Sequence, residues 1–370
     1  MKLSCTQENL NKGLNLVSRI ITPKITLPIL NNVLLETDKG RLKISVTDLE
    51  IGINIWIRSK IEKEGKITVP AKIISEFVSL CDDKQIDIIQ TDQKIDLKTD
   101  NYSATIQGTT ADEFPLIPEV KDAPICSVSG KILEEAIPQV IVAAAIDETR
   151  PVLSGICFKF TQNKLKLAAT DSYRLAENTI PLEQKLKADQ TVIVPLKTIQ
   201  EIGRVLAGTA SENVKISISE NQIRFAVNDD VEIISRLIEG NFPNYEQIIP
   251  QNYNTKVKMD FEDFQSALKI VSLFAKESAN NIKIKLEKGK NLEITAQAEQ
   301  VGTSKARAKA EISGDDLELS FNSKFVLDGL NAIKRGKINF DLSGKLSPAK
   351  LIVADSKNYF YIIMPLRMEE

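Results

Sequence analysis

The chain repeats a set of short motifs at a nearly constant spacing, and this repeat limits the possible folds more than any other feature. Thr26-Leu27-Pro28-Ile29-Leu30 returns as Thr149-Arg150-Pro151-Val152-Leu153, 123 positions later. The second anchor, Leu42-Lys43-Ile44 with Thr47-Asp48, returns as Leu165-Lys166-Leu167 with Thr170-Asp171. The third anchor, Val69-Pro70-Ala71-Lys72, returns as Val194-Pro195-Leu196-Lys197 and again as Phe321-Asn322-Ser323-Lys324. The fourth anchor, Glu113-Phe114-Pro115, returns as Asn241-Phe242-Pro243. A solenoid unit has only about 20–50 residues, so a period of this size predicts whole domains in tandem.

Each copy has the same order of local patterns. Leu10, Leu14 and Val17 recur at helical spacing, which predicts an amphipathic helix. The alternating segments 32–37 and 41–46, joined by Asp38-Lys39-Gly40, predict a hairpin.

A second helix is expected after the Pro of the third anchor, since proline suits a helix start. In the first copy, Ile73, Ile74, Phe77 and Leu80 are expected to form its apolar stripe. Alternating segments such as 86–89 and 94–97 then close the copy as strands.

This order of helices and strands predicts an α+β fold with mainly antiparallel sheets, present three times. The expected domains are 1–120, 126–248 and 253–370. Polar or proline-bearing linkers at 118–125 and 250–255 separate them.

The composition excludes several classes of function. The chain has no His, so His-based catalysis and His-ligated metal sites are ruled out. Its four Cys are widely spaced, which excludes paired-cysteine zinc or redox motifs and suits a reducing cytoplasm. With 48 basic and 50 acidic residues, no overall attraction to nucleic acid is expected, although a local basic face remains open. We therefore expect no metal and no cofactor.

An enzymatic reading would rest on Asp48 and Asp171, which each follow a Thr after a predicted strand. They occupy equivalent places in different copies, so we expect them to lie far apart and to cap turns. No phosphate-binding glycine loop occurs among the 16 Gly.

The anchors together resemble the family of the bacterial DNA polymerase III beta subunit, the sliding clamp. The resemblance is carried by the segments 26–32, 150–155, 169–176, 242–245 and 362–367, and it runs in family order from Leu3 to Met368. It implies a processivity factor without chemistry of its own. Its implied form is a head-to-tail homodimer in the bacterial cytoplasm, a ring of six domains whose twelve helices surround duplex DNA.

A ring of this kind holds DNA by enclosure, so its pore contacts should be cationic and independent of sequence. Lys24 stands just before the first motif, where the family carries a DNA-contacting Arg. The candidate pore residues are Lys12, Arg19, Lys24, Lys72, Lys197, Arg204, Lys324 and Arg335.

The resemblance also implies a client cleft between the second and third domains, where polymerases and other clients insert a short peptide. The matching residues are Leu153, Thr170, Ser172, Tyr173, Arg174, Leu175, Pro243, Ile248, Asn322, Phe325, Leu346, Pro348, Ile362, Met364, Pro365, Leu366 and Arg367. The aliphatic residues offer apolar pockets, and Met adapts to varied ligands. Arg174 and Arg367 are expected at the rim, where they could hold carbonyls or carboxylates.

Five residues depart from the family pattern. Ser172-Tyr173 replaces the usual Gly-His, and Gln247 stands where a basic residue is common. Glu369 and Glu370 extend past the usual end and add negative charge.

For the dimer contact, Tyr102 and Ile106 of the first domain are expected to meet Leu273 and Phe274 of the partner's third domain. Sheet edges would pair there across subunits. The implied partners are double-stranded DNA, a second copy of the chain, the DNA polymerase III alpha subunit, a clamp-loader ATPase and other clamp-motif proteins.

The main alternative is a scaffold that binds peptides but not DNA. Such a protein would share the client cleft and lack a pore. A sequence-specific DNA-binding regulator is disfavoured, because no basic recognition module is present.

Overall fold

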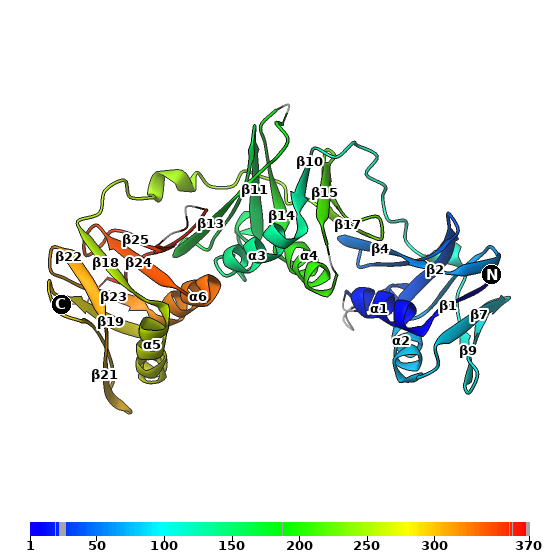
Figure 1. Ribbon diagram of the computed structural model, residues 1–370, viewed down its shortest axis with the longest axis horizontal. Coiled ribbons are helices and arrows are strands. Elements are labelled where there is room, and N and C mark those ends of the chain that lie inside the picture. Colours follow the sequence, from blue (N-terminus) through cyan, green and yellow to red (C-terminus); the bar gives the residue numbers. More distant parts are fainter. Residues whose placement is uncertain are drawn as a thin grey trace. The chain divides into compact units, whose positions relative to one another are not determined.

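The computed structural model describes residues 1–18, 20–21, 27–147, 149–186, 188–209, 211–354, 356 and 358–367. Every strand pair among these residues is antiparallel, and two α-helices fall in each repeat (Figure 1). The predicted α+β class with antiparallel sheets is therefore confirmed.

The described residues of the first repeat form two α-helices and nine strands. Their bounds are β1 Lys2–Thr6, α1 Gln7–Val17, β2 Asn32–Asp38, β3 Arg41–Thr47, β4 Ile51–Arg58, β5 Lys60–Lys63, β6 Lys66–Pro70, α2 Ala71–Leu80, β7 Gln85–Thr91, β8 Lys94–Lys98 and β9 Ser103–Gln107.

In the second repeat, the residues that the structure describes form two α-helices and eight strands. They are β10 Cys126–Ser129, α3 Gly130–Ile141, β11 Gly155–Thr161, β12 Lys164–Thr170, β13 Arg174–Pro181, β14 Gln190–Pro195, α4 Leu196–Gly208, β15 Asn213–Ile218, β16 Gln222–Val227 and β17 Val231–Arg236.

The third repeat again shows two α-helices, here with nine strands, within its described part. They are β18 Thr255–Asp260, α5 Phe261–Ala275, β19 Asn281–Leu286, β20 Leu292–Ala298, β21 Gly302–Ala308, β22 Ala310–Gly314, β23 Leu317–Asn322, α6 Ser323–Ile333, β24 Lys337–Leu342, β25 Ala349–Val353 and β26 Tyr359–Ile363.

Local chemistry explains where these elements begin and turn. The Thr6 hydroxyl accepts the Asn9 N–H and caps α1, and the Asn322 side chain accepts the Lys324 and Phe325 N–H groups to cap α6. Lys39 and Gly40 both have positive φ, as a two-residue hairpin turn between β2 and β3 requires.

The chain divides into two compact units, and the second repeat contributes to both. One unit comprises 1–131 and 201–237, with sheets in the order β5-β1-β7-β8-β9 and β10-β15-β16-β17-β4-β3-β2-β6. The other comprises 132–200 and 238–370, with sheets β14-β11-β12-β13-β26-β25-β24-β18-β22 and β21-β20-β19-β23. Strands of neighbouring repeats thus share sheets, and the predicted domain boundaries remain a prediction.

The same junction recurs in both units. In the first, β17 pairs with β4 and places Ser235 opposite Ile51; in the second, β26 pairs with β13 and places Ile363 opposite Arg174. After each pairing the next residue donates to the other repeat's turn: Arg236 N–H to the Glu50 carbonyl, and Met364 N–H to the Tyr173 carbonyl.

The helix faces follow the predicted pattern in α1 but not in α2. Leu10, Leu14 and Val17 of α1 are fully buried, as predicted. In α2 the buried residues are Ala71, Ile74 and Val78, whereas Ile73 is 53% exposed and Leu80 82%. The predicted stripe of α2 was wrong in part, because apolar residues occupy two adjacent faces of this helix.

Candidate functional site

A tight turn between β12 and β13 organises the predicted client cleft. The Thr170 hydroxyl accepts the Ser172 N–H (3.2 Å) and donates to the Arg174 carbonyl (2.7 Å). One oxygen of Asp171 accepts the N–H groups of Tyr173 and Arg174, each at 3.0 Å. Ser172 adopts a φ of +78°.

The first repeat builds the same turn with its own Thr-Asp pair. Thr47 accepts the Leu49 N–H (3.0 Å) and donates to the Ile51 carbonyl (2.9 Å), while Asp48 accepts the N–H groups of Glu50 and Ile51. Leu49 also has a φ of +78°. Both aspartates cap turns, as predicted.

Arg174 lies beneath the surface and not at the predicted rim, which corrects that expectation. Its side chain is 7% exposed. Its Nε donates to Asp171 (2.8 Å), its Nη1 donates to Asp328 (2.5 Å), and its Cζ lies 4.4 Å from the Phe325 ring centroid. Burial by itself would lower the pKa of Arg174, but Tyr361 and the two carboxylates outweigh burial and raise it.

Above this ion pair lies an aromatic stack. The Tyr173 ring, 63% exposed, stacks on the Phe325 ring with centroids 6.3 Å apart and an interplanar angle of 27°. Residues 364–366 run beside this stack, because the Met364 N–H donates to the Tyr173 carbonyl and the Leu366 N–H donates to the Ser320 carbonyl (2.8 Å). The structure thus brings Tyr173, Arg174, Phe325 and Met364 together.

The other predicted cleft residues divide by exposure. Leu153, Thr170, Leu175 and Ile362 are buried and belong to the supporting core. The exposed members of the set are Ser172, Pro243, Ile248, Leu346 and Arg367. The half-buried members are Asn322, Pro348, Met364, Pro365 and Leu366. Glu369 and Glu370 lie outside the described residues.

The connector after β17 is anchored near these residues. Tyr245 is buried against Cys157, Leu175 and Ile362, and its hydroxyl donates to Glu177 (2.6 Å). Lys166 lies 3.5 Å from the same buried carboxylate. This anchor fixes the segment that carries Pro243 and Ile248.

Sequence reasoning missed three residues of this region. Asp328 and Tyr361 contact Arg174, and Arg150 donates to the Ser172 hydroxyl (3.1 Å). The one available signal was the helical spacing of Phe325 and Asp328, which places both on one face of α6. A cavity of about 500 Å³, lined by Leu366 and Arg367 with Lys283 and Ser320, adjoins the set and was also not predicted.

The predicted pore cations occupy a repeated position. Lys72, Lys197 and Lys324 are each the second residue of a helix, in α2, α4 and α6. No acidic residue stands in the first turn of any of these helices. A cation in the first turn opposes the helix dipole, although Lys72 also lies 3.9 Å from the Glu76 carboxylate one turn further along α2.

The remaining pore candidates differ in their surroundings. Arg204 pairs with the buried Glu201 carboxylate (2.6 Å), which commits its guanidinium within the chain. Arg335 follows α6 and is exposed. Arg19 and Lys24 lie outside the described residues.

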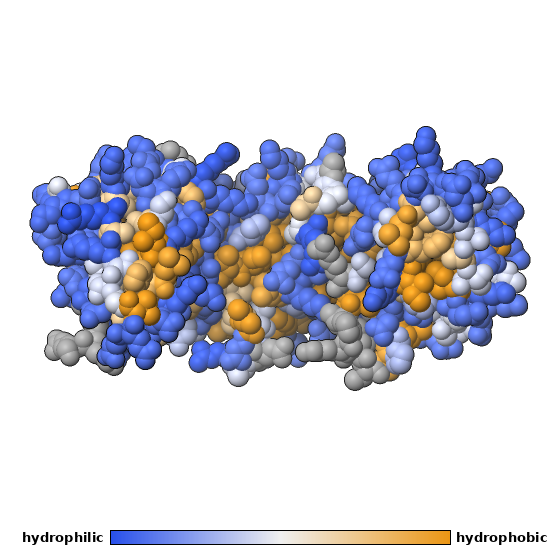
Figure 2. Space-filling model, turned by 90° about the horizontal axis from the view of Figure 1, so that it is seen from below, coloured by the Kyte–Doolittle hydropathy of each residue, from blue (hydrophilic) through white to orange (hydrophobic). Residues whose placement is uncertain are grey.

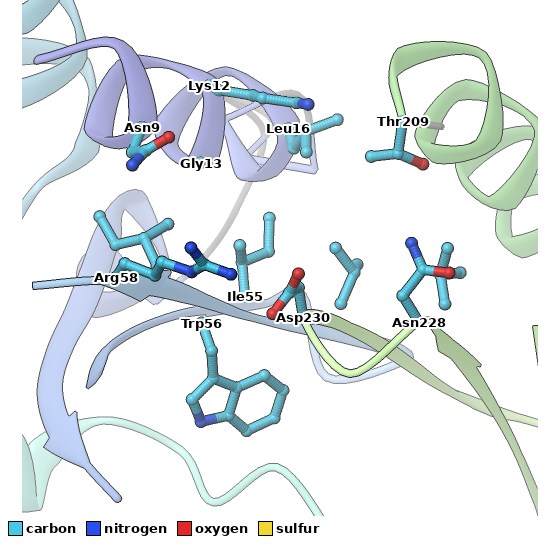
Figure 3. A pocket seen from close by; sticks show the side chains of 13 residues that line it. Asn9, Lys12, Gly13, Leu16, Ile55, Trp56, Arg58, Thr209, Asn228 and Asp230 are labelled. Carbon is cyan, nitrogen blue, oxygen red and sulfur yellow. The ribbon is translucent and has the colours of Figure 1, made fainter. Parts of the chain in front are cut away.

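Lys12 stands on α1 at the mouth of a cavity of about 410 Å³. Figure 3 shows Lys12 and Leu16 of α1 facing Ile55 and Arg58 of β4, with Thr209 and Asn228 closing the far side. Trp56, whose Nε1 donates to Asp38 (2.7 Å), projects to the other side of the strand.

Two of the four predicted dimer residues, Tyr102 and Leu273, lie on exposed apolar surfaces. One surface is formed by Ile73 and Leu80 of α2 and by Tyr102, which directly precedes β9. The other is on α5, where Ile270 and Leu273 are 55% and 63% exposed. Figure 2 shows apolar surface over both helices. Ile106 is only 5% exposed and packs in its own sheet, and Phe274 is half-buried.

Among the residues that the structure describes, no group of acidic or Cys side chains could hold a metal ion. No described helix is long and apolar enough to span a membrane.

Three family models match the chain in sequence. They describe the N-terminal, central and C-terminal domains of the DNA polymerase III beta subunit, and they match residues 1–118, 127–244 and 246–367.

Proteins similar over the full length carry one description. The beta sliding clamp of Synechococcus elongatus is 32% identical, with 100% of both chains covered, and that of Staphylococcus epidermidis is 30% identical over 99% of both. Among solved structures, the DNA polymerase sliding clamp of Bacillus subtilis has a TM-score of 0.94 at 26% identity, with 100% of both chains covered. The DNA polymerase III subunit beta of Pseudomonas aeruginosa has the same TM-score and coverage at 28% identity.

Proposed function

The chain belongs to the DNA polymerase III beta subunit family, the bacterial sliding clamps, and from this premise we propose that two copies close head to tail into a ring around duplex DNA. The fold is three tandem clamp domains, and the function is that of a DNA sliding clamp, a processivity factor. The observation that carries this function is full-length agreement with sliding-clamp structures at a TM-score of 0.94.

The first-turn lysines support the proposed pore. Lys72, Lys197 and Lys324 repeat at one structural position although the helix dipole disfavours them there. The backbone phosphates of enclosed DNA would attract cations at this position in every repeat. Lys12 and Arg335 are exposed and fit the same role, whereas the ion pair of Arg204 with Glu201 weakens its case.

The proposed client cleft comprises the exposed part of the predicted set, built around the Tyr173–Phe325 stack. Leu346, Ile248 and Met364 offer apolar contacts, and Arg367 offers a cation at one end. The proposed occupants are peptides of the DNA polymerase III alpha subunit, the clamp-loader ATPase and other clients. A clamp that acts this way needs no chemistry of its own and works in the bacterial cytoplasm, where the chromosome lies.

The two exposed apolar surfaces support the head-to-tail dimer. A heterologous contact joins two different patches, and the chain offers one on its first repeat and another on its third. The strands β9 and β21 are sheet edges, and pairing across subunits would cover them.

Charge reversal separates this function from the peptide-binding scaffold. We expect K72E/K197E/K324E to shorten retention on closed circular DNA and to flatten its salt dependence, because fewer phosphates are neutralised. The matched control is K60E/K164E/K288E, which reverses one exposed lysine per repeat away from the helices. Equal retention of both triple variants would favour the scaffold.

A further inference from the structure

The Arg174 guanidinium is enclosed on its edges and on its face. Asp171 and Asp328 take two of its nitrogens, the Tyr361 hydroxyl lies 3.5 Å from Nη1, and the Phe325 ring covers its face at 4.4 Å. These contacts come from the turn between β12 and β13, from α6 and from β26. With Nε and Nη1 committed in this way and the side chain only 7% exposed, Arg174 is better placed to orient other groups than to bind a client carboxylate.

Helix α6 supplies both the ring and one of the carboxylates. Phe325 and Asp328 are three residues apart, so their side chains lie on the same face of the helix. Asp328 therefore holds the edge of the guanidinium while Phe325 contacts its face. Within the described residues, Arg174 is the only ion-pair partner of Asp328.

The same helix is pressed against β26. The Tyr361 hydroxyl donates to the Phe325 carbonyl (3.0 Å), and a Cβ on Gly329 would lie 2.4 Å from the Tyr361 ring. The backbone at Phe325 is thus fixed. The plane of the Phe325 ring depends on what lies against it, which is Arg174 and the exposed Tyr173.

We propose that Asp328 is a positioning residue for client binding: it holds Arg174 flat on Phe325 and so fixes the exposed Phe325–Tyr173 wall. This inference rests on the proposed client cleft. Asp171 has a further role, because it also caps the turn through two N–H groups. Asp328 acts on the wall through Arg174 alone, which makes it the cleaner residue to test.

The test is a double-mutant cycle in the full-length protein, with a fluorescent peptide copied from the clamp-binding segment of the polymerase alpha subunit of the same bacterium. Fluorescence anisotropy gives the dissociation constant. We expect D328N to raise it about tenfold, D328E to return it to within about threefold, and F325L to raise it about tenfold. If Asp328 acts through Phe325, D328N/F325L should bind no more weakly than F325L alone.

The control is E293Q on β20, which breaks the ion pairs of Glu293 with Lys305 (2.6 Å) and Arg307 (3.2 Å) of β21 and should leave peptide affinity unchanged. Additive losses of about a hundredfold in the double variant would contradict the inference. So would D328N binding within twofold of the wild type, or failure of D328N to fold, which would assign Asp328 to overall stability. If the wild type itself binds no peptide, the proposed cleft fails and the inference with it.

Discussion

At the scale of single residues, Leu49 and Ser172 hold the same strained conformation for the same reason. Each follows a Thr-Asp pair whose side chains bind the turn's backbone, and each has a φ of +78°. This region of φ costs a residue with a Cβ about 1–3 kcal/mol. The surrounding hydrogen bonds impose the strain on two quite different side chains.

Replacing either residue by glycine should therefore stabilise the chain. We expect Ser172→Gly and Leu49→Gly each to raise the free energy of unfolding by about 0.5–1 kcal/mol, since relief of strain exceeds the added flexibility of the unfolded chain. Urea unfolding measures it. A loss of stability in both variants would mean that the turns do not impose the strain.

The buried thiols predict a pH dependence of stability. Burial raises the pKa of Cys5, Cys126 and Cys157 to about 12, from an ordinary value of 9.0. As pH rises above about 9, the unfolded chain loses these protons first, so the free energy of unfolding should fall between about pH 9 and pH 12. Cys157→Ala should make this decline shallower in urea unfolding at pH 8.5 to 10.5. If the free energy of unfolding falls equally steeply with pH in Cys157→Ala and in the wild type, the buried Cys157 thiol does not contribute to the decline.

The sequence predicted the role of Asp48 and Asp171 but misplaced Arg174. A turn cap depends on neighbours two or three positions away, which a sequence displays directly. The environment of Arg174 depends on Asp328 and Tyr361, which are 154 and 187 positions away. No local pattern reports such partners.

At the scale of elements, α4 and α6 show how a glycine can serve packing in one helix and not in another. A Cβ on Gly329 of α6 would collide with the Tyr361 ring at 2.4 Å. A Cβ on Gly208 of α4 would make only ordinary contact with Leu16, at 3.5 Å.

We expect Gly329→Ala to lower the free energy of unfolding by about 1–3 kcal/mol, because Tyr361 is fully buried and has little room to shift. Gly208→Ala should be neutral or stabilising by up to about 1 kcal/mol, given the higher helix propensity of alanine. Chemical denaturation of the two variants and the wild type measures both changes in the free energy of unfolding. Equal effects would mean that α6 can move away from β26.

Apolar spacing predicted the presence of α1 and α2 because both carry a clear helical period. It failed to separate buried from exposed residues in α2, where Ile73 and Leu80 face outward. An apolar pattern indicates which residues favour burial. It does not indicate whether the chain's own core or a second molecule buries them. Likewise the pairing of β4 with β17 joins segments about 180 positions apart, which no local signal encodes.

At the scale of the whole molecule, the head-to-tail dimer predicts that its two surfaces can be broken separately. Leu80→Asp and Leu273→Asp should each give monomers in sedimentation experiments at micromolar concentration, because a charge enters an apolar contact. Leu116→Asp is the matched control, at a side chain that is 95% exposed on a linker.

Mixing the two variants tests the symmetry. In a heterologous contact, the intact third domain of the Leu80→Asp chain can meet the intact first domain of the Leu273→Asp chain, so the mixture should recover dimers with one good interface. An isologous contact would leave the mixture monomeric.

The central claim is that this clamp holds DNA by enclosing it. The most direct measurement is retention of the wild-type protein on closed circular and on linear duplex DNA, loaded with the matching clamp loader and ATP. The account predicts retention on closed circles that is lost when the circle is cut, because the ring slides off free ends. Equal retention on circular and linear DNA would contradict it, since direct contacts would then hold the DNA.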